Sequence, residues 1–280
     1  MKEKTKKYSL IVATVNREKE IDELLESIKE SEYDLTLIEI IIVDQNKTIK
    51  LETIINKYEK EMEIKHIYSN KFGLSVNRNI GIKMSRGEIL AFPDDDCKYL
   101  KETLKKVEEL FRNKNIECIM GRIIDENGED SLKKWPKKRL KINKGNFFRK
   151  ASSITMFVKN KKILFDEQLG VGEYFGSNED SDYIYQLLNK NLCIEYDPRI
   201  VLYHPKSTKE NFTEMKAYKY GLGFGAFCKK NKGLIHIFIL GNLWTIFNIL
   251  KGIKKMDIPM IKVFYMNIKG RIKGFLEYKK

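Results

Sequence analysis

Short apolar runs alternate with segments of helical periodicity along the first two-thirds of this chain, and this alternation constrains the fold most strongly. The apolar runs, which are typical of buried strands, are residues 8–14, 38–43, 64–68, 88–92 and 116–124. The segments between them repeat apolar residues every three or four positions, as amphipathic helices do; they are residues 18–30, 49–60, 75–85 and 100–111. Strands that alternate with helices in this way indicate an α/β protein whose sheet is covered on both faces.

The alternation stops near residue 206. Before that point the sequence predicts three further strands and a helix, at residues 152–158, 180–190, 192–196 and 199–203, where 180–190 is the helix. Residues 125–150 are polar and basic, which predicts an excursion over the surface. Beyond residue 206 the chain is first aromatic and glycine-rich, then apolar and basic. We therefore expect one domain at residues 1–205 and a C-terminal helical region at residues 206–280.

Three consecutive aspartates follow the strand at residues 88–92. Because side chains alternate in an extended chain, Asp94 and Asp96 are expected to point one way and Asp95 the other. Neighbouring carboxylates repel one another unless a cation compensates them, and a pair of carboxylates suits Mg²⁺ or Mn²⁺. A divalent ion with coordination positions left for phosphate oxygens indicates chemistry on a nucleoside diphosphate. An acidic turn in solvent is the alternative.

Asp44 also follows a strand, and this favours the binding hypothesis for the aspartate triplet. Ligands of open α/β sheets bind at the carboxyl ends of the strands, where both Asp44 and the triplet are expected.

The net charge of +14 calls for an acidic partner, which is nucleic acid, anionic lipid or a phosphorylated substrate. Half of that charge lies in residues 251–280, which carry nine basic and two acidic side chains. This tail follows the most apolar stretch of the chain, residues 234–250. A membrane-spanning helix needs about 20 apolar residues, and this stretch is shorter and contains His236, Asn242 and Asn248. We expect a helix that lies on an anionic membrane surface; a core helix or a dimer interface is the alternative.

Several other functional classes receive no support from the sequence. The four cysteines are scattered without Cys-x-x-Cys or Cys/His zinc spacing, which predicts reduced thiols in a cytosolic protein. The basic N-terminus is followed by a strand-like run, so we expect no signal peptide. Neither the phosphate-loop motif nor the nucleophile-elbow motif occurs. The glycines from Gly221 to Gly225 lack the preceding strand of a dinucleotide-binding fingerprint.

Five blocks of sequence occur together in the order and spacing of a known family. They are Ser-Leu-Ile-Val-Ala-Thr-Val-Asn-Arg (9–17), Ile-Ile-Val-Asp-Gln-Asn (41–46), Gly-Leu-Ser-Val-Asn-Arg-Asn-Ile-Gly-Ile (73–82), Gly-Glu-Ile-Leu-Ala-Phe-Pro-Asp-Asp-Asp-Cys (87–97) and Gly-Ser-Asn-Glu-Asp-Ser-Asp (176–182). Over residues 8–205 the chain resembles the family 2 glycosyltransferases of GT-A fold, which take sugars from nucleotide sugars with inversion at the anomeric carbon. The resemblance implies a mixed, mostly parallel sheet flanked by helices; the C-terminal helical appendage is expected from the change of sequence pattern near residue 206.

The resemblance also implies a metal site and a catalytic base. Asp94 and Asp96 match the family's Asp-x-Asp motif, which holds Mn²⁺ or Mg²⁺ against the donor diphosphate. His204 matches a third metal ligand of some members; a capping or phosphate-contacting histidine is the alternative. Glu179 and Asp180 match the family's Glu-Asp motif, in which the aspartate deprotonates the acceptor hydroxyl as general base. The alternative is that Asp180 and Asp182 stabilise the first turn of a helix.

Nucleotide-sugar contacts are implied for a further set of residues, which comprises Thr14, Asn16, Arg17, Asp44, Arg78, Asn79 and Asp95. Asp44 would accept the imide N–H of uracil or thymine, and Asp95 would face the ribose. The two arginines would contact base or phosphate, for which a planar guanidinium suits. Asn79 would serve the nucleotide or a hydrogen bond within its helix. Gln45-Asn46 departs from the family's usual residues after Asp44, so the contacts of that loop differ from the pattern.

The sequence thus predicts an inverting hexosyl- or N-acetylhexosaminyltransferase. It would move a sugar from a UDP- or dTDP-sugar to a glycan or lipid-linked glycan in cell-surface polysaccharide synthesis. We expect a cytoplasmic enzyme, peripheral on the inner face of the cell membrane through residues 234–280, that binds no nucleic acid. Pairing of two copies is the other use of that region.

Two rival hypotheses remain. A sugar-1-phosphate nucleotidyltransferase shares a related sheet, but it would need a glycine- and arginine-rich loop where residues 14–17 stand. A non-enzymatic protein that binds anionic polymers is motivated by the net charge of +14.

Overall fold

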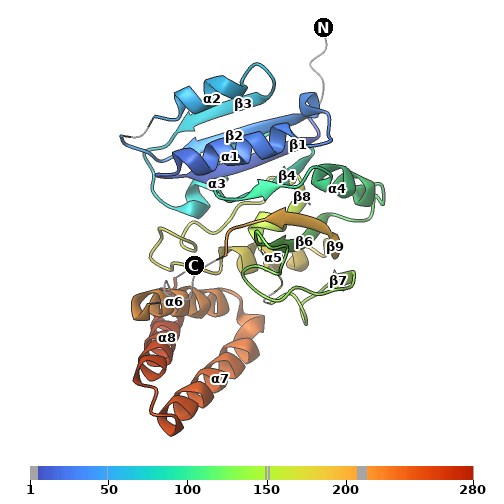
Figure 1. The fold of residues 1–280 in the computed structure, drawn as a ribbon. Helices are drawn as coiled ribbons and strands as arrows, with labels where there is room; N and C mark the ends of the chain where they lie inside the picture. Colours follow the sequence, from blue (N-terminus) through green and yellow to red (C-terminus); the bar gives the residue numbers. More distant parts are fainter. Residues whose placement is uncertain (1–5, 49, 149, 151, 207–212, 280) are drawn as a thin grey trace. The chain divides into compact units, whose positions relative to one another are not determined.

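A computed structural model describes the chain except residues 1–5, 49, 149, 151, 207–212 and 280 (Figure 1). The chain divides into two compact units. Unit 1 consists of residues 1–72, 76–164 and 183–207, and unit 2 of residues 73–75, 165–182 and 208–280. The domain boundary near residue 206 stays a prediction, because compactness alone does not define a domain.

Unit 1 is built on a mixed sheet of nine strands in the described residues. Its order is β3-β2-β1-β4-β8-β6-β9-β5, and β7 pairs with β9 beside that path. The strands are β1 Tyr8–Thr14, β2 Ile38–Asp44, β3 Glu63–Tyr68, β4 Ile89–Ala91, β5 Lys98–Tyr99, β6 Cys118–Ile124, β7 Leu140–Ile142, β8 Phe157–Lys159 and β9 Ile194–Tyr203. Strands β3, β2, β1 and β4 are parallel, and β8 joins them antiparallel. Every residue of β1 and β2 is buried, which explains their continuous apolar character.

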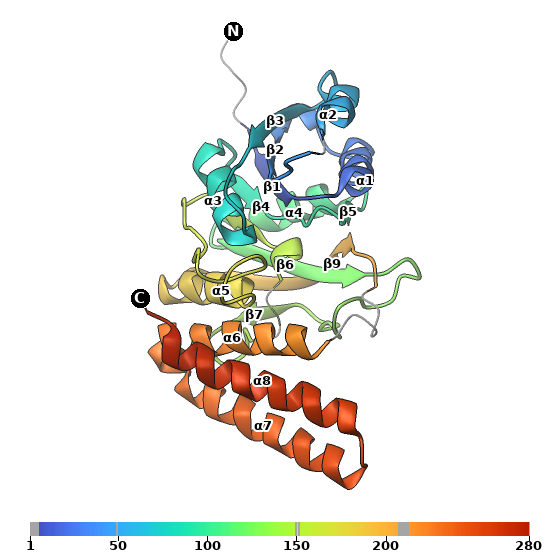
Figure 2. The same cartoon turned by 90° about the vertical axis from the view of Figure 1, so that its left-hand side faces the viewer.

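Helices flank this sheet, as the alternation of the sequence predicts. They are α1 Glu18–Lys29, α2 Glu52–Tyr58, α3 Leu74–Met84, α4 Thr103–Phe111 and α5 Glu179–Asn189. Figure 2 shows α1 and α2 on one side of β1–β3 and α3 on the other. In α1 the apolar face of Ile21, Leu24, Leu25 and Ile28 is buried, so helical periodicity and packing agree.

The structure differs from the expected elements in several places. Leu100 lies before α4 and is 40% exposed, because Lys98–Tyr99 first pairs with β9 as β5. Residues 153–155 form a 3-10 helix, so β8 is shorter than the expected strand. The expected strands at 192–196 and 199–203 are one strand, β9, whose pairing with β6 shifts register between Met120 and Arg122. The polar excursion at 125–150 contains β7. The differences at β5, β7 and β9 involve pairing with partners far away in sequence, which local patterns do not encode.

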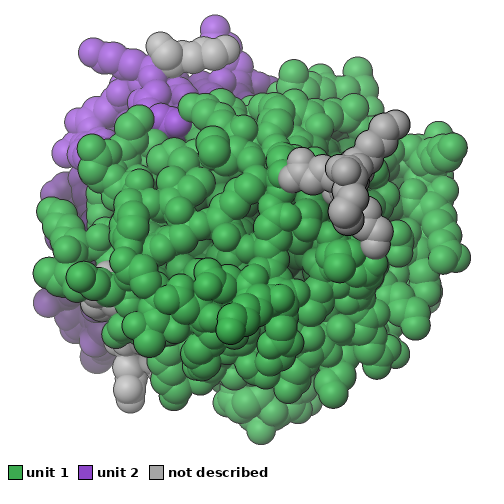
Figure 3. All heavy atoms as spheres, turned by 90° about the horizontal axis from the view of Figure 1, so that it is seen from above, with its two compact units in different colours: residues 1–72, 76–164, 183–207 green, residues 73–75, 165–182, 208–280 purple. Residues whose placement is uncertain are grey.

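Unit 2, coloured purple in Figure 3, contains the C-terminal helices α6 Glu214–Lys230, α7 Ile235–Lys254 and α8 Ile258–Glu277. Helices α6 and α8 meet through glycines spaced four residues apart, Gly221 and Gly225 on α6 and Gly270 and Gly274 on α8. A Cβ atom added at any of these four positions would lie 2.0–2.2 Å from a backbone oxygen of the other helix. The two backbones therefore touch, in the way that paired Gly-x-x-x-Gly motifs allow. The glycines from Gly221 to Gly225, which do not form a dinucleotide-binding fingerprint, thus allow α6 to pack closely against α8.

Helix α7 turns its apolar side chains outward. Leu240, Leu243, Phe247, Leu250 and Ile253 are each more than half exposed. Among the described residues, Lys232–Lys254 is the single helical segment whose length of 23 residues and mean hydropathy of 1.7 would allow it to cross a membrane. The helix extends beyond the apolar stretch of residues 234–250 at its C-terminal end, so a membrane span joins the surface helix as an alternative for this segment. Length and composition alone do not distinguish a span from a helix that lies on a surface.

Candidate functional site

The parallel strands of unit 1 bring together polar residues that lie far apart in sequence. Thr14 ends β1, Asp44 ends β2, and the triplet Asp94, Asp95 and Asp96 follows β4. Strand β1 pairs in parallel with both β2 and β4. The carboxyl ends of the three strands consequently meet at one edge of the sheet, where α/β proteins bind their ligands.

Asp94, Asp96 and His204 form a group that suits a divalent ion. One ligand atom of each residue lies within 4.8 Å of those of the other two. His204 follows β9, whose last residue, Tyr203, pairs with Lys98 just after the triplet, and this pairing returns the histidine to the aspartates. Two carboxylate oxygens and one imidazole nitrogen are a donor set that fits Mn²⁺ better than Mg²⁺.

The ring of His204 is held from both sides. Its Nε2 atom lies 3.3 Å from Oδ1 of Asp96, and its Nδ1 atom lies 2.7 Å from the backbone carbonyl of Pro205. Burial alone would lower the pKa of His204, but the hydrogen bond and the charge of Asp96 outweigh it, and the pKa is raised. A proton on Nδ1, donated to Pro205, leaves Nε2 available as a metal ligand.

Two arginines compensate the charge of the aspartates. Arg78, on α3, is 1% exposed and donates from Nη2 to Oδ1 of Asp94 at 2.7 Å. Arg17, just before α1, has its Nη2 atom 3.7 Å from Oδ2 of Asp96 and also pairs with Glu20. The structure thus brings both arginines to the candidate metal group. Asn79, the next residue on α3, is buried as well.

Asp95 is held by β1. The hydroxyl of Thr14 donates to its Oδ2 atom at 2.8 Å. Burial raises the pKa of Asp95 to about 6; repulsion by Asp96 and Asp94 adds to this effect, while Thr14 and Arg17 oppose it. Asp95 therefore occupies an environment distinct from that of its two neighbours.

Asp44 is fully buried at the end of β2. Its Oδ1 atom accepts the backbone N–H of Asn46 at 2.7 Å, and its Oδ2 atom lies 2.9 Å from Nε2 of His66 on β3. The backbone N–H of Asn16, which has a φ of 58°, donates to the side-chain oxygen of Asn46 at 2.6 Å. The unusual Asn46 therefore ties the loops after β1 and β2 together. The sequence analysis did not include His66 among the candidate site residues. Its place beside Asp44 follows from the parallel pairing of β3 with β2.

Glu179 and Asp180 open α5, and residues 179–182 belong to unit 2. Three acids lie in the first turn of this helix, where the positive end of the helix dipole favours ionised carboxylates. The third of them, Asp182, is fully buried and accepts from Nζ of Lys230 at 2.7 Å and from Asn231 at 3.0 Å. Lys230 also pairs with Asp166 at 2.8 Å. The end of α6 thus fixes the start of α5, a link that no local sequence pattern signals.

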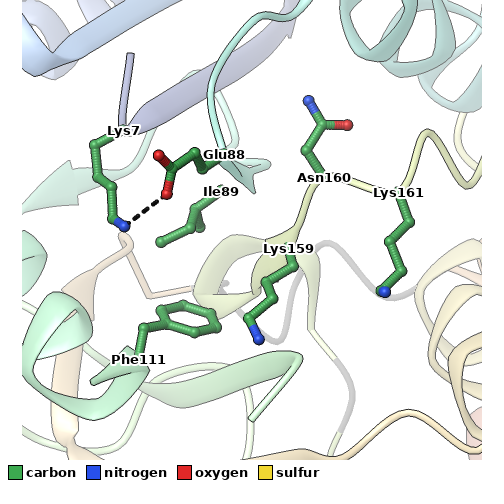
Figure 4. A pocket seen from close by; sticks show the side chains of 7 residues that line it. All are labelled: Lys7, Glu88, Ile89, Phe111, Lys159, Asn160 and Lys161. Carbon is green, nitrogen blue, oxygen red and sulfur yellow. Dashed lines mark hydrogen bonds and ion pairs between the residues drawn. The ribbon is translucent and has the colours of Figure 1, made fainter. Parts of the chain in front are cut away.

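A pocket of about 370 Å³ lies at the other end of the strands of unit 1. Figure 4 shows its lining, which includes Lys7 before β1, Glu88 before β4 and Lys159 at the end of β8. Lys7 and Glu88 form an ion pair at 2.8 Å. Because none of the candidate site residues lines this pocket, it is separate from the carboxyl edge of the sheet.

The candidates expected from the sequence fall into two groups. Ten of them lie in unit 1: Thr14, Asn16, Arg17, Asp44, Arg78, Asn79, Asp94, Asp95, Asp96 and His204. The contacts above link all of these except Asn79 to the carboxyl edge of the sheet. The remaining two, Glu179 and Asp180, lie in unit 2.

Curated proteins similar to this chain include two bacterial glycosyltransferases. The Staphylococcus aureus poly(ribitol-phosphate) beta-N-acetylglucosaminyltransferase TarS is 32% identical over 124 residues, which are 44% of this chain and 22% of TarS. The match therefore spans about a fifth of that protein's length. The Campylobacter jejuni GalNAc(5)-diNAcBac-PP-undecaprenol beta-1,3-glucosyltransferase is 25% identical over 225 residues, which are 78% of this chain and 72% of that protein.

Solved structures share the fold. A crystal structure of residues 1–349 of S. aureus TarS has a TM-score of 0.64 at 18% identity and covers 94% of this chain and 92% of its own. The mannosyltransferase PcManGT of Pyrobaculum calidifontis, in complex with GDP-Man and Mn²⁺, has a TM-score of 0.67 at 12% identity, with coverage of 98% and 88%. These likenesses establish the GT-A fold expected from the sequence blocks. Residues 9–169, more than half of the chain, match the family model described as Glycosyl transferase family 2, and the chain belongs to this family.

Proposed function

We propose that this chain is an inverting glycosyltransferase that uses a UDP- or dTDP-sugar together with Mn²⁺ or Mg²⁺. The observation that carries the proposal is the convergence of Asp94, Asp96 and His204 at the carboxyl edge that also holds Asp44. These three side chains would hold the ion. When bound there, the ion supplies positive charge against the negative charge that grows on the leaving diphosphate.

The other residues of this edge would bind the nucleotide. Each carboxylate oxygen of Asp44 has a lone pair beyond those used by Asn46 and His66, so Asp44 can accept the imide N–H of uracil or thymine. Cytosine lacks that N–H, so the carboxylate of Asp44 would favour uracil or thymine over cytosine. The guanidinium groups of Arg17 and Arg78 would donate to base or phosphate oxygens. Asp95, held by Thr14, would face the ribose.

Asp180 would act as the general base. It would take the proton of the acceptor hydroxyl while that oxygen forms its bond to the anomeric carbon. The bond from this carbon to the diphosphate oxygen breaks at the same time, and the electron pair leaves with the diphosphate. A single displacement of this kind inverts the anomeric configuration. The pair of Lys230 and Asp182 would hold the first turn of α5, and with it Asp180, in place.

The named relatives support the substrate classes of this proposal. TarS is named for transfer of N-acetylglucosamine to poly(ribitol phosphate), and a TarS structure contains UDP-GlcNAc. The C. jejuni relative is named for transfer of glucose to a glycan on diphosphoundecaprenol. We propose a UDP-sugar as donor and a glycan, on a lipid or polymer carrier, as acceptor.

We also propose that the protein attaches to the cytoplasmic face of the cell membrane through α7 and α8. The exposed apolar side chains of α7 are followed by Lys251, Lys254 and Lys255, an arrangement that suits the surface of an anionic bilayer. Pairing of two copies through the same apolar residues is the competing use.

The test of the proposed reaction is transfer from a panel of nucleotide sugars, measured with purified full-length protein. We expect release of UDP or dTDP that stops with EDTA and returns with Mn²⁺, and a product with inverted configuration by NMR. Asp180→Asn should lower kcat by about 10²- to 10⁴-fold with little change in donor affinity. Wild-type kcat in Asp180→Asn or in Asp96→Ala would refute the assigned roles. Release of pyrophosphate from UTP or dTTP, when a sugar 1-phosphate replaces the nucleotide sugar, would indicate the rival nucleotidyltransferase.

A further inference from the structure

Residues 131–150, termed the basic segment below, hold the densest positive charge of the chain. They carry nine lysines and arginines and no acidic residue. The C-terminal tail at residues 251–280 has as many basic side chains, but they are two-thirds as dense along the chain, and two acids accompany them. The net positive charge of the basic segment is therefore larger than that of the tail.

The backbone of the basic segment is anchored to the sheet of unit 1. Strand β7 pairs antiparallel with the start of β9, which places Leu140 opposite Tyr196. Trp135 is 3% exposed and stacks on the ring of Tyr196 with an interplanar angle of 3°. The hydroxyl of Tyr196 donates to the carbonyl of Pro136 at 2.8 Å. The basic side chains near β7 consequently project from a paired backbone, so that binding an anion there orders little additional backbone.

Three of these charges have no internal compensation. The exposed ammonium groups of Lys134, Lys138 and Lys141 make no ion pair or hydrogen bond with any other residue that the structure describes. By contrast, Lys137 pairs with Asp130, and Arg139 pairs with Glu195. The three lysines therefore keep their full attraction for an external anion.

The basic segment begins beside the strands that lead to the candidate metal group. The N–H of Ser131 donates to the carbonyl of Ile123, and the N–H of His204 donates to that of the next residue, Ile124. In the register of β6 and β9, Met120 lies opposite Tyr196 and Ile124 opposite Tyr203. These four steps along β6 correspond to about 13 Å, the length of a few sugar units. A chain-like ligand on the basic segment could thus extend toward His204.

The surroundings of the three lysines disfavour two classes of anionic partner. Proteins that bind single-stranded nucleic acid offer aromatic rings for base stacking, but Trp135 and Phe147 are buried and Phe148 is half-buried. Membrane surfaces require exposed apolar side chains, and in the basic segment only Leu132 is a large apolar residue counted as exposed among the described residues. A hydrophilic polymer with repeated anionic groups satisfies both conditions.

We infer that the basic segment binds the acceptor, and that this acceptor is a polyanionic glycan with phosphodiester or carboxylate groups along its chain. The inference rests on the proposed function in one respect, since it takes the bound polymer to be the acceptor of the transfer. Lysines act here as point charges that contact successive anionic groups. Because several weak contacts act together, affinity depends on the length of the polymer and falls as salt rises.

The test compares two triple variants of the full-length protein. The first is Lys134→Gln with Lys138→Gln and Lys141→Gln. The matched control is Lys60→Gln with Lys105→Gln and Lys114→Gln, which removes the same charge from exposed lysines of unit 1 whose ammonium groups have no ion pair with a described residue. Fluorescence titration over a range of salt concentrations measures binding of linear polyphosphate, polygalacturonate and neutral dextran.

We expect wild type and control to bind one or both polyanions but not dextran. The first variant should bind about tenfold more weakly, and its plot of log affinity against log salt should be less steep by about 2, as three lost anion contacts predict. Equal affinity and slope in the two variants would overturn the inference. Vesicles of phosphatidylglycerol and single-stranded DNA serve as competing probes. A defect confined to either of these would assign the basic segment to a membrane or to nucleic acid instead.

A failure of this inference can be told apart from a failure of the proposed function. Polymer binding is measured without a donor, so it judges the basic segment even if no sugar is transferred. Hydrolysis of nucleotide sugars by wild type and control judges the proposed reaction. With an anionic acceptor, the first variant should show a KM raised about tenfold and an unchanged kcat. A lowered kcat with unchanged KM would contradict a role in acceptor binding.

Discussion

Both units of this chain have buried apolar residues, but they differ in how much apolar surface they leave exposed. In unit 1 the apolar side chains of β1 and β2 form the core, and polar groups collect at the carboxyl ends of the strands. In unit 2 the glycines of α6 and α8 form the closest contact, while large apolar side chains of α7 face outward. In unit 1 the apolar side chains of these strands are thus buried by other parts of the same chain, as the hydrophobic effect favours. Unit 2 leaves apolar side chains of α7 exposed, and this exposure motivates the proposed attachment to a membrane.

The largest effect is expected where the two helices of unit 2 touch. Gly225→Leu should lower the free energy of unfolding of unit 2 by more than about 3 kcal/mol, because its Cβ atom would lie 2.0 Å from the carbonyl oxygen of Arg271. Lys262→Leu, which adds the same side chain on the exposed face of α8, is the control and should change it by less than about 0.5 kcal/mol. Urea unfolding followed by circular dichroism measures both. Equal effects of the two changes would show that the glycine contact does not hold α6 against α8.

A smaller effect is expected from a buried carboxylate of unit 1. Glu39 on β2 is fully buried; its Oε1 atom accepts from Ser9 and its Oε2 atom pairs with Lys65 at 2.8 Å. Burial alone would raise the pKa of Glu39, but these hydrogen bonds, with one from the backbone of Arg86, lower it to about 2. A lowered pKa stabilises the fold above the ordinary pKa of 4.5, and the stabilisation is lost as the pH falls toward 2.

The pH dependence of unfolding tests this reading of Glu39. The contribution of the carboxylate is about 3 kcal/mol near neutral pH, and Glu39→Gln should remove most of it. The stability of wild type and variant should therefore converge between pH 4.5 and pH 2. Urea unfolding at several pH values measures the difference. A constant difference across that interval would mean that the variant acts through packing rather than through charge.

The smallest effect on stability, and a large one on binding, is expected on α7. Phe247 is 62% exposed, so Phe247→Glu should change the free energy of unfolding by less than about 0.5 kcal/mol. Phe157→Ala, in the core of unit 1, should lower it by about 3–5 kcal/mol. Flotation with phosphatidylglycerol vesicles should succeed for wild type and fail for Phe247→Glu. Light scattering distinguishes membrane attachment from pairing of two copies. A wild-type dimer that becomes a monomer in the variant would assign the apolar face to subunit pairing.

Most elements of unit 1 could be predicted because their signals are local. The apolar run of β2 and the spacing of Leu24, Leu25 and Ile28 in α1 determine a strand and a helix without reference to the rest of the chain. Strands β5 and β7 were missed because they are short and exist only through their pairing with β9. The paired glycines of α6 and α8 did leave a signal, since Gly-x-x-x-Gly occurs in both helices. Nothing local indicates which other segment such a motif faces.

The candidate site shows the same division. The aspartate triplet, the Glu-Asp pair and their order along the chain identify the family from sequence, because these motifs are contiguous and lie next to predictable strands and helices. The contacts of Asp44 with His66 and of Asp182 with Lys230 join residues that are 22 and 48 positions apart. Sequence reasoning did not find either partner.

The order of most strands and helices of unit 1, the family and the type of each candidate residue could be read from the amino-acid sequence, since they depend on periodicity and on short motifs. The meeting of His204 with the aspartates after β4, the glycine contact of α6 with α8 and the anchoring of the basic segment on β9 depend on strand register and helix packing. Those features are set by which distant surfaces bury one another, and only the folded chain decides that.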